Sequence, residues 1–191
     1  MSYKTDLLLQ TDTFFHIYNR GTNRGRIFFS RDNYLYFLQK VRKYREQFGV
    51  SIISYCLMPN HFHFLVLQRI QHAISDFMKL TSNSYAKALN KWLGRTGHLF
   101  EGKYKIRKVD SDVYLIHLSR YLHINPVRAK LVERPEEWEF SSYRDYLGLR
   151  KGTLPEPKYI LNIFKSTAEY REFVNDFKPQ DLELIQGFMY E

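Results

Sequence analysis

Apolar and polar positions along the chain form two kinds of pattern. Four segments have the alternating or short apolar pattern of strands: residues 13–19, 50–57, 58–66 and 103–109. Two others carry apolar side chains every three or four positions, which predicts amphipathic helices over residues 31–48 and 71–93. The resulting order is β-α-β-β-α-β, so we predict an α+β protein with a ferredoxin-like sheet.

A further helix is predicted after the fourth strand, with Asp110 or Ser111 as its cap. Its apolar stripe, assigned to the core, consists of Leu115, Leu118 and Leu122. A neighbouring polar stripe consists of Tyr114, His117, Tyr121 and Asn125. Asn125 precedes Pro126 and is therefore biased out of helical geometry, which places it at the end of this helix.

The remainder of the chain predicts short elements. Residues 135–149 read as a loop and a short helix, and residues 150–157 read as a linker. Two short helices are expected at residues 167–177 and 181–189, separated by Pro179. Residues 167–191 hold six acidic and two basic side chains. We therefore expect a first domain over residues 1–150 and, over 151–191, a linker with an acidic helical extension.

Composition limits the class of protein. The chain of 191 residues is 44% hydrophobic and 17% aromatic, enough for one domain with a sizeable core. A single cysteine, Cys56, excludes an internal disulfide and fits a reducing compartment. The first residues lack the pattern of a signal peptide, and no apolar run approaches the ~20 residues needed to cross a bilayer. We expect a soluble, cytoplasmic protein.

The charge predicts a polyanionic partner. The formal net charge is +9, and residues 20–45 hold eight basic side chains but one acidic one. In the fourth strand the bases alternate onto one face, and aromatic residues interleave with the basic segments, as in a groove for single-stranded nucleic acid. The expected nucleic-acid contacts are Arg20, Arg24, Arg26, Lys103, Lys105, Arg107 and Arg128. For Lys40, Arg42 and Lys43, a solvated helix face explains the charge equally well.

The segment Met58-Pro59-Asn60-His61-Phe62-His63 holds the first candidate chemistry. It reads as a strand entered through a Pro-Asn turn, so His61 and His63 project from one face. Two neighbouring imidazoles form half of a divalent-metal site, although histidines at a surface or core edge give the same pattern.

The second candidate is the pair Tyr121 and Asn125, which lie four residues apart and share a helix face. A strand His-hydrophobic-His followed by this pair resembles the single-tyrosine HUH transposases. The two segments MPNHFHFLV and RYLHINPVRAKLV resemble the motifs of the branch called REP-associated tyrosine transposases. The resemblance extends from about Phe15 to about Leu149.

This resemblance implies a function and a site. It implies Tyr121 as the nucleophile, with His61, His63 and Asn125 as ligands of a divalent ion, Mg²⁺ or Mn²⁺. It implies cleavage and rejoining of single-stranded, hairpin-forming DNA through a 5′-phosphotyrosine, in a bacterial, nucleoid-associated protein that is a monomer or a homodimer. The expected fold is the ferredoxin-like sheet with an added tyrosine-bearing helix.

Several alternatives stay open at this point. Tyr114, two turns earlier on the same stripe, is a rival nucleophile, and Tyr121 could be an ordinary ring at a helix end. Asn125 could be a helix C-cap. His117 and His123 are candidates for the general base only because they are close in sequence. The whole chain could be a non-catalytic nucleic-acid-binding module, either RNA-binding or a domesticated transposase, and a plasmid-nicking or replication-initiating enzyme is a third possibility.

Overall fold

The computed structural model describes residues 10–185. Its strands are β1 (Thr13–Arg20), β2 (Val50–Met58), β3 (His61–Gln68) and β4 (Lys105–Val109). Its helices of eight residues or more are α2 (Arg31–Phe48), α3 (Ala73–Trp92), α4 (Asp112–Arg128) and α7 (Thr167–Asn175). The shorter ones are η1 (Thr22–Arg24), η2 (Pro135–Glu137), α5 (Tyr143–Tyr146), α6 (Lys158–Leu161) and η3 (Pro179–Ile185). The α+β class is confirmed, and up to β4 the element order is the predicted β-α-β-β-α-β.

The strands form one sheet in the order β2-β3-β1-β4, with antiparallel pairing between all neighbours. In this register Tyr18 of β1 lies opposite both His63 of β3 and Lys105 of β4, and Arg20 lies opposite His61. Residues directly opposite one another in an antiparallel pair share a face of the sheet. Aromatic, basic and histidine side chains of three strands are therefore brought to one face.

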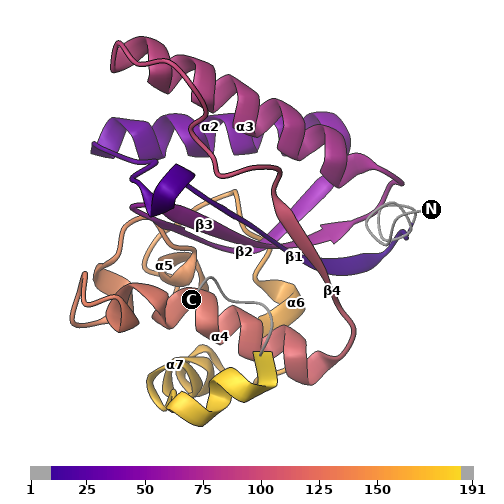
Figure 1. Ribbon diagram of the computed structural model, residues 1–191. Coiled ribbons are helices and arrows are strands. Elements are labelled where there is room, and N and C mark those ends of the chain that lie inside the picture. Colours follow the sequence, from indigo (N-terminus) through magenta and orange to yellow (C-terminus); the bar gives the residue numbers. More distant parts are fainter. Residues whose placement is uncertain (1–9, 186–191) are drawn as a thin grey trace.

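The two faces of the sheet pack against different helices (Figure 1). On one face, Phe15, Phe62 and Phe64 are fully buried in a cluster with residues of α2 and α3. On the other, Leu65 belongs to a second apolar cluster with residues of α4, α5, α6 and α7. Because side chains alternate along a strand, His61 and His63 share the α4 face with Leu65.

Helix α4 begins at one of the two predicted caps, Ser111, whose Oγ accepts a hydrogen bond from the backbone N–H of Tyr114 at 3.2 Å. The helix continues through Pro126 to Arg128, so the expectation that the chain leaves helical geometry at Asn125 is wrong. An interior proline costs a helix about 3 kcal/mol. Leu118 and Leu122 are fully buried, and this tertiary packing offsets that cost.

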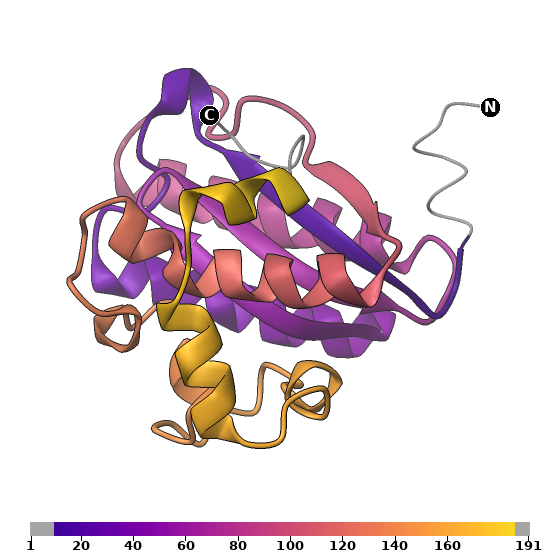
Figure 2. The same ribbon diagram turned by 90° about the horizontal axis from the view of Figure 1, so that it is seen from below.

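The C-terminal elements pack against α4 (Figure 2). Tyr170 and Val174 of α7 and Ile185 at the end of η3 are buried in the same cluster as α4. Helix α7 ends two residues earlier than predicted, and η3 is a 3-10 helix. Residues 186–189 of the second predicted helix lie outside the described residues.

The segment 150–157, which the composition predicts to be a linker, lies against the edge of the sheet. Pro155 forms a parallel bridge with Ile52 of β2, and the Glu156 backbone N–H donates to the Ile52 carbonyl at 2.8 Å. Leu154 is buried in the cluster beneath α2 and α3. Helix α6, which was not predicted, follows directly.

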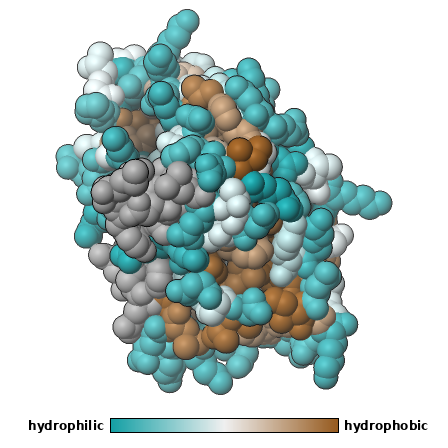
Figure 3. Space-filling view, turned by 90° about the vertical axis from the view of Figure 1, so that its right-hand side faces the viewer, coloured by the Kyte–Doolittle hydropathy of each residue, from teal (hydrophilic) through white to brown (hydrophobic). Residues whose placement is uncertain are grey.

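On the face shown in Figure 3, hydrophilic side chains predominate and hydrophobic ones gather in smaller patches between them. Among residues 10–185, no helix combines the length and the apolar character that a membrane span requires.

Candidate active site

The turn between β2 and β3 sets the position of the two predicted histidines. Pro59 and Asn60 connect Met58 to His61, which lie opposite each other in the hairpin. The ring centroids of His61 and His63 are 5.0 Å apart, so the predicted shared face brings the two imidazoles together. His63 is fully buried, and His61 is partly exposed at the strand end.

Each of these imidazoles uses its Nδ1 within the protein. His61 Nδ1 lies 2.7 Å from Asn60 Oδ1, and His63 Nδ1 lies 2.9 Å from Nε2 of His16, on β1. An amide oxygen can only accept, so His61 Nδ1 carries the hydrogen and its Nε2 keeps a lone pair. His63 Nε2 is buried without a hydrogen-bond partner. Metal-binding histidines usually have this arrangement, in which the other nitrogen is held by the protein.

The surroundings keep both imidazoles neutral. Burial, and next the positive charge of Arg20, lowers the pKa of His61 to about 4. Burial, followed by the neighbouring His61 and His16, lowers the pKa of His63 well below its usual value. Neutral imidazole is the form that binds a metal ion. At neutral pH this pair therefore needs no deprotonation before it can bind a cation.

Helix α4 places Tyr121 beside this pair. The Tyr121 ring stands edge-on to that of His63, with 5.6 Å between the ring centroids, and Tyr121 is 4% exposed. The guanidinium carbon of Arg128 lies 5.5 Å from the centre of the Tyr121 ring. The histidine strand and the tyrosine helix, which are about 60 residues apart in sequence, therefore meet at one place.

The rival tyrosine lies in a different environment. Tyr114, near the start of α4, is also buried, and this burial raises its pKa. After burial, the side chains that affect this pKa are Tyr18 of β1 and then Arg107 of β4. Tyr121 is the tyrosine of α4 that is in ring contact with His63.

Asn125 lies one turn after Tyr121 and is 6% exposed. The C-cap of α4 is Ala129, so the alternative interpretation of Asn125 as a C-cap is wrong. Its Nδ2 has no hydrogen-bond partner, although an unpaired buried polar group costs about 1–3 kcal/mol. Rotation of the carboxamide by 180° can place its oxygen in the same position. Asn125 is thus a buried polar group with unused hydrogen-bonding capacity near Tyr121.

The ligands predicted from the sequence are two imidazoles and one amide. Within residues 10–185, no group of three or more His, Cys, Asp and Glu side chains is arranged to hold a metal ion. The donor set His61, His63 and Asn125 contains no carboxylate, so it supplies no negative charge. Oxygen ligands from a phosphate and water would complete the coordination of a hard ion.

The predicted basic loop after β1 is hydrogen-bonded to the Pro59-Asn60 turn. Gly21 N–H donates to the Asn60 carbonyl at 2.8 Å, and Asn60 Nδ2 donates to the Arg24 carbonyl at 3.1 Å. A Cβ on Gly21 would lie 2.0 Å from the Gly25 carbonyl oxygen, so only glycine permits this close approach. The exposed side chains of Arg24 and Arg26 are therefore presented next to the start of β3.

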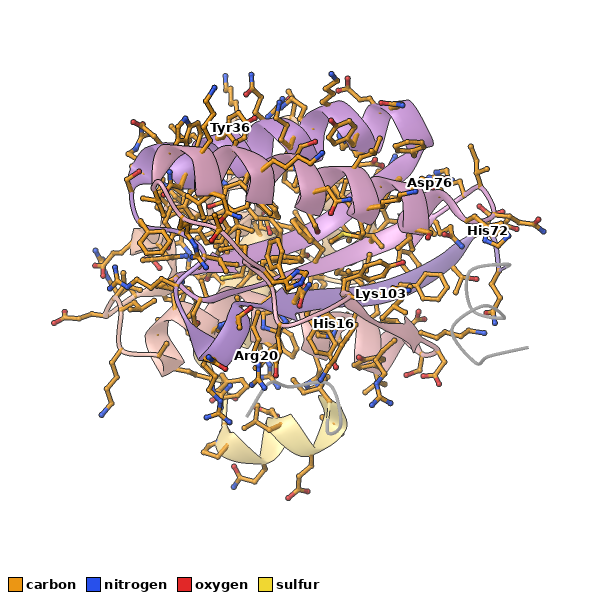
Figure 4. The ribbon with its side chains drawn as sticks, turned by 45° about the horizontal axis from the view of Figure 1, so that its top comes forward. His16, Arg20, Tyr36, His72, Asp76 and Lys103 are labelled. Atoms are coloured by element: carbon orange, nitrogen blue, oxygen red, sulfur yellow. The ribbon has the colours of Figure 1, made fainter. Side chains whose placement is uncertain are left out.

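Of the remaining basic residues predicted to contact nucleic acid, some lie on the histidine face of the sheet and one lies in a cleft beside α3. Arg20, at the end of β1 (Figure 4), forms an ion pair with Glu101, with 3.0 Å between Nη2 and Oε1. Lys105 and Arg107, opposite Tyr18 and His16, share the histidine face. The strand β4 begins at Lys105, so the prediction that Lys103 belongs to the same strand face is wrong. Lys103 lines a cleft of about 850 Å³ together with residues of α3.

The two histidines of α4, the candidate bases, make hydrogen bonds with other side chains. His123 is fully buried, with Nδ1 2.7 Å from the Tyr170 hydroxyl and Nε2 2.8 Å from Ser142 Oγ. His117 Nδ1 accepts a hydrogen bond from Arg120 Nη2 at 2.8 Å. The site also contains His16, which the sequence analysis did not single out. The sequence shows that His16 lies on the same strand face as Tyr18, two residues later. Its contact with His63 depends on the register between β1 and β3.

Comparisons with known proteins show the family and the fold. The family model for IS200-like transposases matches residues 10–125, which is more than half of the chain and includes His61, His63, Tyr121 and Asn125. A REP-associated tyrosine transposase solved with a REP hairpin has a similar fold, with a TM-score of 0.64 at 13% identity over 78% of this chain and 93% of that one.

A protein from Deinococcus radiodurans, provisionally assigned as a transposase, aligns with a TM-score of 0.43 at 18% identity, over 56% of this chain and 86% of its own. No curated protein matches the sequence. The family predicted from the two motifs is confirmed. The chain belongs to the IS200-like transposase family and is an enzyme that acts on DNA.

Proposed function

We propose that this protein is a metal-dependent transposase of the REP-associated branch. It cleaves and rejoins single-stranded DNA at hairpin-forming palindromic elements, through a 5′-phosphotyrosine on Tyr121. The observation that carries the proposal is the ring contact between Tyr121 and His63, 5.6 Å between centroids, beside two imidazoles whose Nε2 atoms are not used by the fold. Residues 1–150 form the catalytic part, and residues 151–191 extend it.

His61, His63 and Asn125 would hold a divalent cation, Mg²⁺ or Mn²⁺. Once bound there, the cation would supply positive charge to the scissile phosphate and fix its orientation. The fit rests on two neutral imidazoles, each held through Nδ1, and on a buried amide with unused capacity. The absence of a carboxylate from this set predicts weak binding of the cation in the absence of DNA.

Tyr121 supplies the nucleophile. Its Oη forms a bond to phosphorus while the bond from phosphorus to the 3′-oxygen breaks, and the proton lost by the phenol balances the one gained by the new 3′-hydroxyl. The phosphotyrosine keeps the energy of the phosphodiester, so a second 3′-hydroxyl can reverse the step without a nucleotide cofactor. Arg128, beside the ring, stabilises the negative charge that develops on the phenol oxygen and the phosphate.

The bases around the histidine face would guide the strand. Arg24 and Arg26 stand at the β2–β3 turn, and Lys105 and Arg107 line the β4 side of the same face. Contacts of this kind neutralise phosphates without reading sequence. A hairpin is the proposed substrate because the structurally similar REP-associated transposase is bound to one. The protein would act in the cytoplasm, at the nucleoid, as a monomer or a homodimer.

The test is a covalent-adduct assay. A labelled hairpin oligonucleotide with single-stranded flanks is incubated with the protein and Mn²⁺ or Mg²⁺, and a DNA–protein adduct resistant to denaturant is expected. Tyr121→Phe abolishes the adduct, while Tyr114→Phe, the matched change on the same helix, leaves it. Peptide mapping locates the phosphate on Tyr121. An undiminished adduct from Tyr121→Phe would contradict the assignment of the nucleophile.

One observation favours a second function, binding without cleavage. Tyr121 is 4% exposed, and a phenol that never reaches a phosphate could only contribute to the core. A non-catalytic module would bind the hairpin with the same salt dependence but yield no adduct with any divalent ion. The same assay therefore separates the two functions.

A further inference from the structure

A third histidine, His16 on β1, lies behind the predicted pair. It is fully buried, and its Nε2 lies 2.9 Å from Nδ1 of His63. The rings of His16 and His63 are 5.1 Å apart between centroids, and the ring of Tyr18 lies against both, at 4.7 Å from His16 and 5.8 Å from His63. His16, labelled in Figure 4, is therefore packed against the rings of two neighbours, one on its own strand and one on β3.

The register of the sheet explains why these two histidines meet. His63 is directly opposite Tyr18, and His16 is directly opposite Leu65, so the two histidines are diagonal neighbours on one face. A shift of one residue in the pairing of β1 with β3 would turn one of them to the other face. The contact depends on a register that the apolar residues of both faces fix.

The contact between two neutral imidazoles has two possible hydrogen positions. If His63 Nδ1 donates, then His63 Nε2 has a lone pair; if His16 Nε2 donates, then His63 Nε2 carries a hydrogen and cannot bind a cation. Neither tautomer satisfies every nitrogen, because His63 Nε2 and His16 Nδ1 both lack partners. The arrangement in which His63 Nδ1 donates is the one that gives His63 Nε2 a lone pair for a ligand.

His16 is suited to the role of acceptor. Its Nε2 lies at hydrogen-bond distance from His63 Nδ1, and a neutral imidazole has a lone pair on one of its two nitrogens. His61 has an equivalent acceptor in Asn60 Oδ1. Each histidine of the pair therefore has a partner at Nδ1, one from the adjoining turn and one from the neighbouring strand.

We propose that His16 is a positioning residue of the active site, which accepts the Nδ1 hydrogen of His63 and so holds His63 in the tautomer whose Nε2 binds the cation. The inference rests on the proposed function, because it assigns His63 as a ligand. His16 itself touches neither the DNA nor the cation. Loss of such a partner typically weakens metal affinity by about 10- to 100-fold.

The test uses two variants of similar size. Gln in His16→Gln keeps an oxygen acceptor near the position of Nε2, whereas Met in His16→Met fills similar space without one. Titration with Mn²⁺ alone measures affinity, and long-range ¹H–¹⁵N spectra of the metal-free protein report the tautomer of His63. His123→Gln, at a fully buried histidine without contact to His63, controls for the loss of any buried imidazole. Thermal unfolding verifies that each variant is folded.

We expect Mn²⁺ affinity to fall by about 10- to 100-fold in His16→Met and to stay within about threefold of the parent in His16→Gln and His123→Gln. The spectra should show a dominant Nδ1–H tautomer of His63 in the parent and His16→Gln, and a mixture in His16→Met. Equal affinity in all variants, or equal loss in both His16 variants, overturns the proposal. If the parent binds no Mn²⁺ even with the hairpin oligonucleotide present, the proposed function fails. The spectra then still decide the role of His16, because an unchanged tautomer in His16→Met refutes it.

Discussion

Two polar regions lie on the α4 side of the sheet, and they differ in how their hydrogen bonds are completed. The candidate active site contains His16, His61, His63, Tyr121 and Asn125. The polar network contains Ser54, Ser119, His123, Ser142, Tyr146 and Tyr170. In the network, Tyr170 links Ser119 to His123 at 2.7 Å each, and His123 continues to Ser142 at 2.8 Å.

In the candidate active site, by contrast, buried nitrogens of His16, His63 and Asn125 have no partner. Buried polar groups are normally satisfied, so unsatisfied ones that gather in one place require an explanation. Both ring nitrogens of His123 are hydrogen-bonded, although the hydroxyl of its neighbour Tyr143 is also buried without a partner. The difference separates a region that stabilises the fold from a region with capacity left for a ligand.

The largest expected effect on the rate of adduct formation comes from His63→Leu. Removal of the ring nitrogens should lower the rate of adduct formation by at least about 10²-fold, as expected when a group that stabilises developing charge is lost. The free energy of unfolding should fall by only about 1 kcal/mol, because a single hydrogen bond, to His16, is lost. Adduct kinetics and urea unfolding of the same preparations measure the two quantities. Retention of the parental rate would remove His63 from the chemistry.

The matched change in the polar network is His123→Leu. It removes two hydrogen bonds, to Tyr170 and Ser142, so the free energy of unfolding should fall by about 2 kcal/mol. The adduct rate, measured well below the unfolding transition, should remain within about threefold of the parent, because the sequence-based role of His123 as a base is not supported by its contacts. A loss of rate as large as that of His63→Leu would show that the two regions are coupled and that the comparison fails.

The parts of this site that the sequence predicts are those set by periodicity. Alternation along β3 places His61 and His63 on one face, and the spacing of Tyr121 and Asn125 places them on one stripe of α4. His16 escapes such reasoning because its contact with His63 depends on strand register across 47 residues of sequence. The register is a property of the folded sheet and is fixed by packing on both faces.

The errors in the fold have the same origin. Local preference ends a helix before Pro126, but the burial of Leu118 and Leu122 keeps α4 intact beyond it. The composition of residues 150–157 predicts a linker, but Leu154 is buried in the core and Pro155 pairs with β2. In each case a tertiary contact outweighs the local signal, as is usual for weak propensities.

The smallest expected effect on the free energy of unfolding comes from Asn125→Leu, and it is opposite in sign to the effects of the two histidine variants. Replacement of a buried amide that lacks one partner by an apolar side chain of similar size removes an uncompensated polar group, so stability should stay constant or rise by about 1 kcal/mol. Loss of the amide oxygen should nevertheless weaken Mn²⁺ binding, and the adduct rate should fall. Ser119→Ala, the matched change in the polar network, should lower stability, because Ser119 is hydrogen-bonded to Tyr170 at 2.7 Å. If Asn125→Leu destabilised the protein as much as Ser119→Ala and left Mn²⁺ affinity unchanged, the unused capacity of Asn125 would have no functional meaning, and the two regions would differ only in packing.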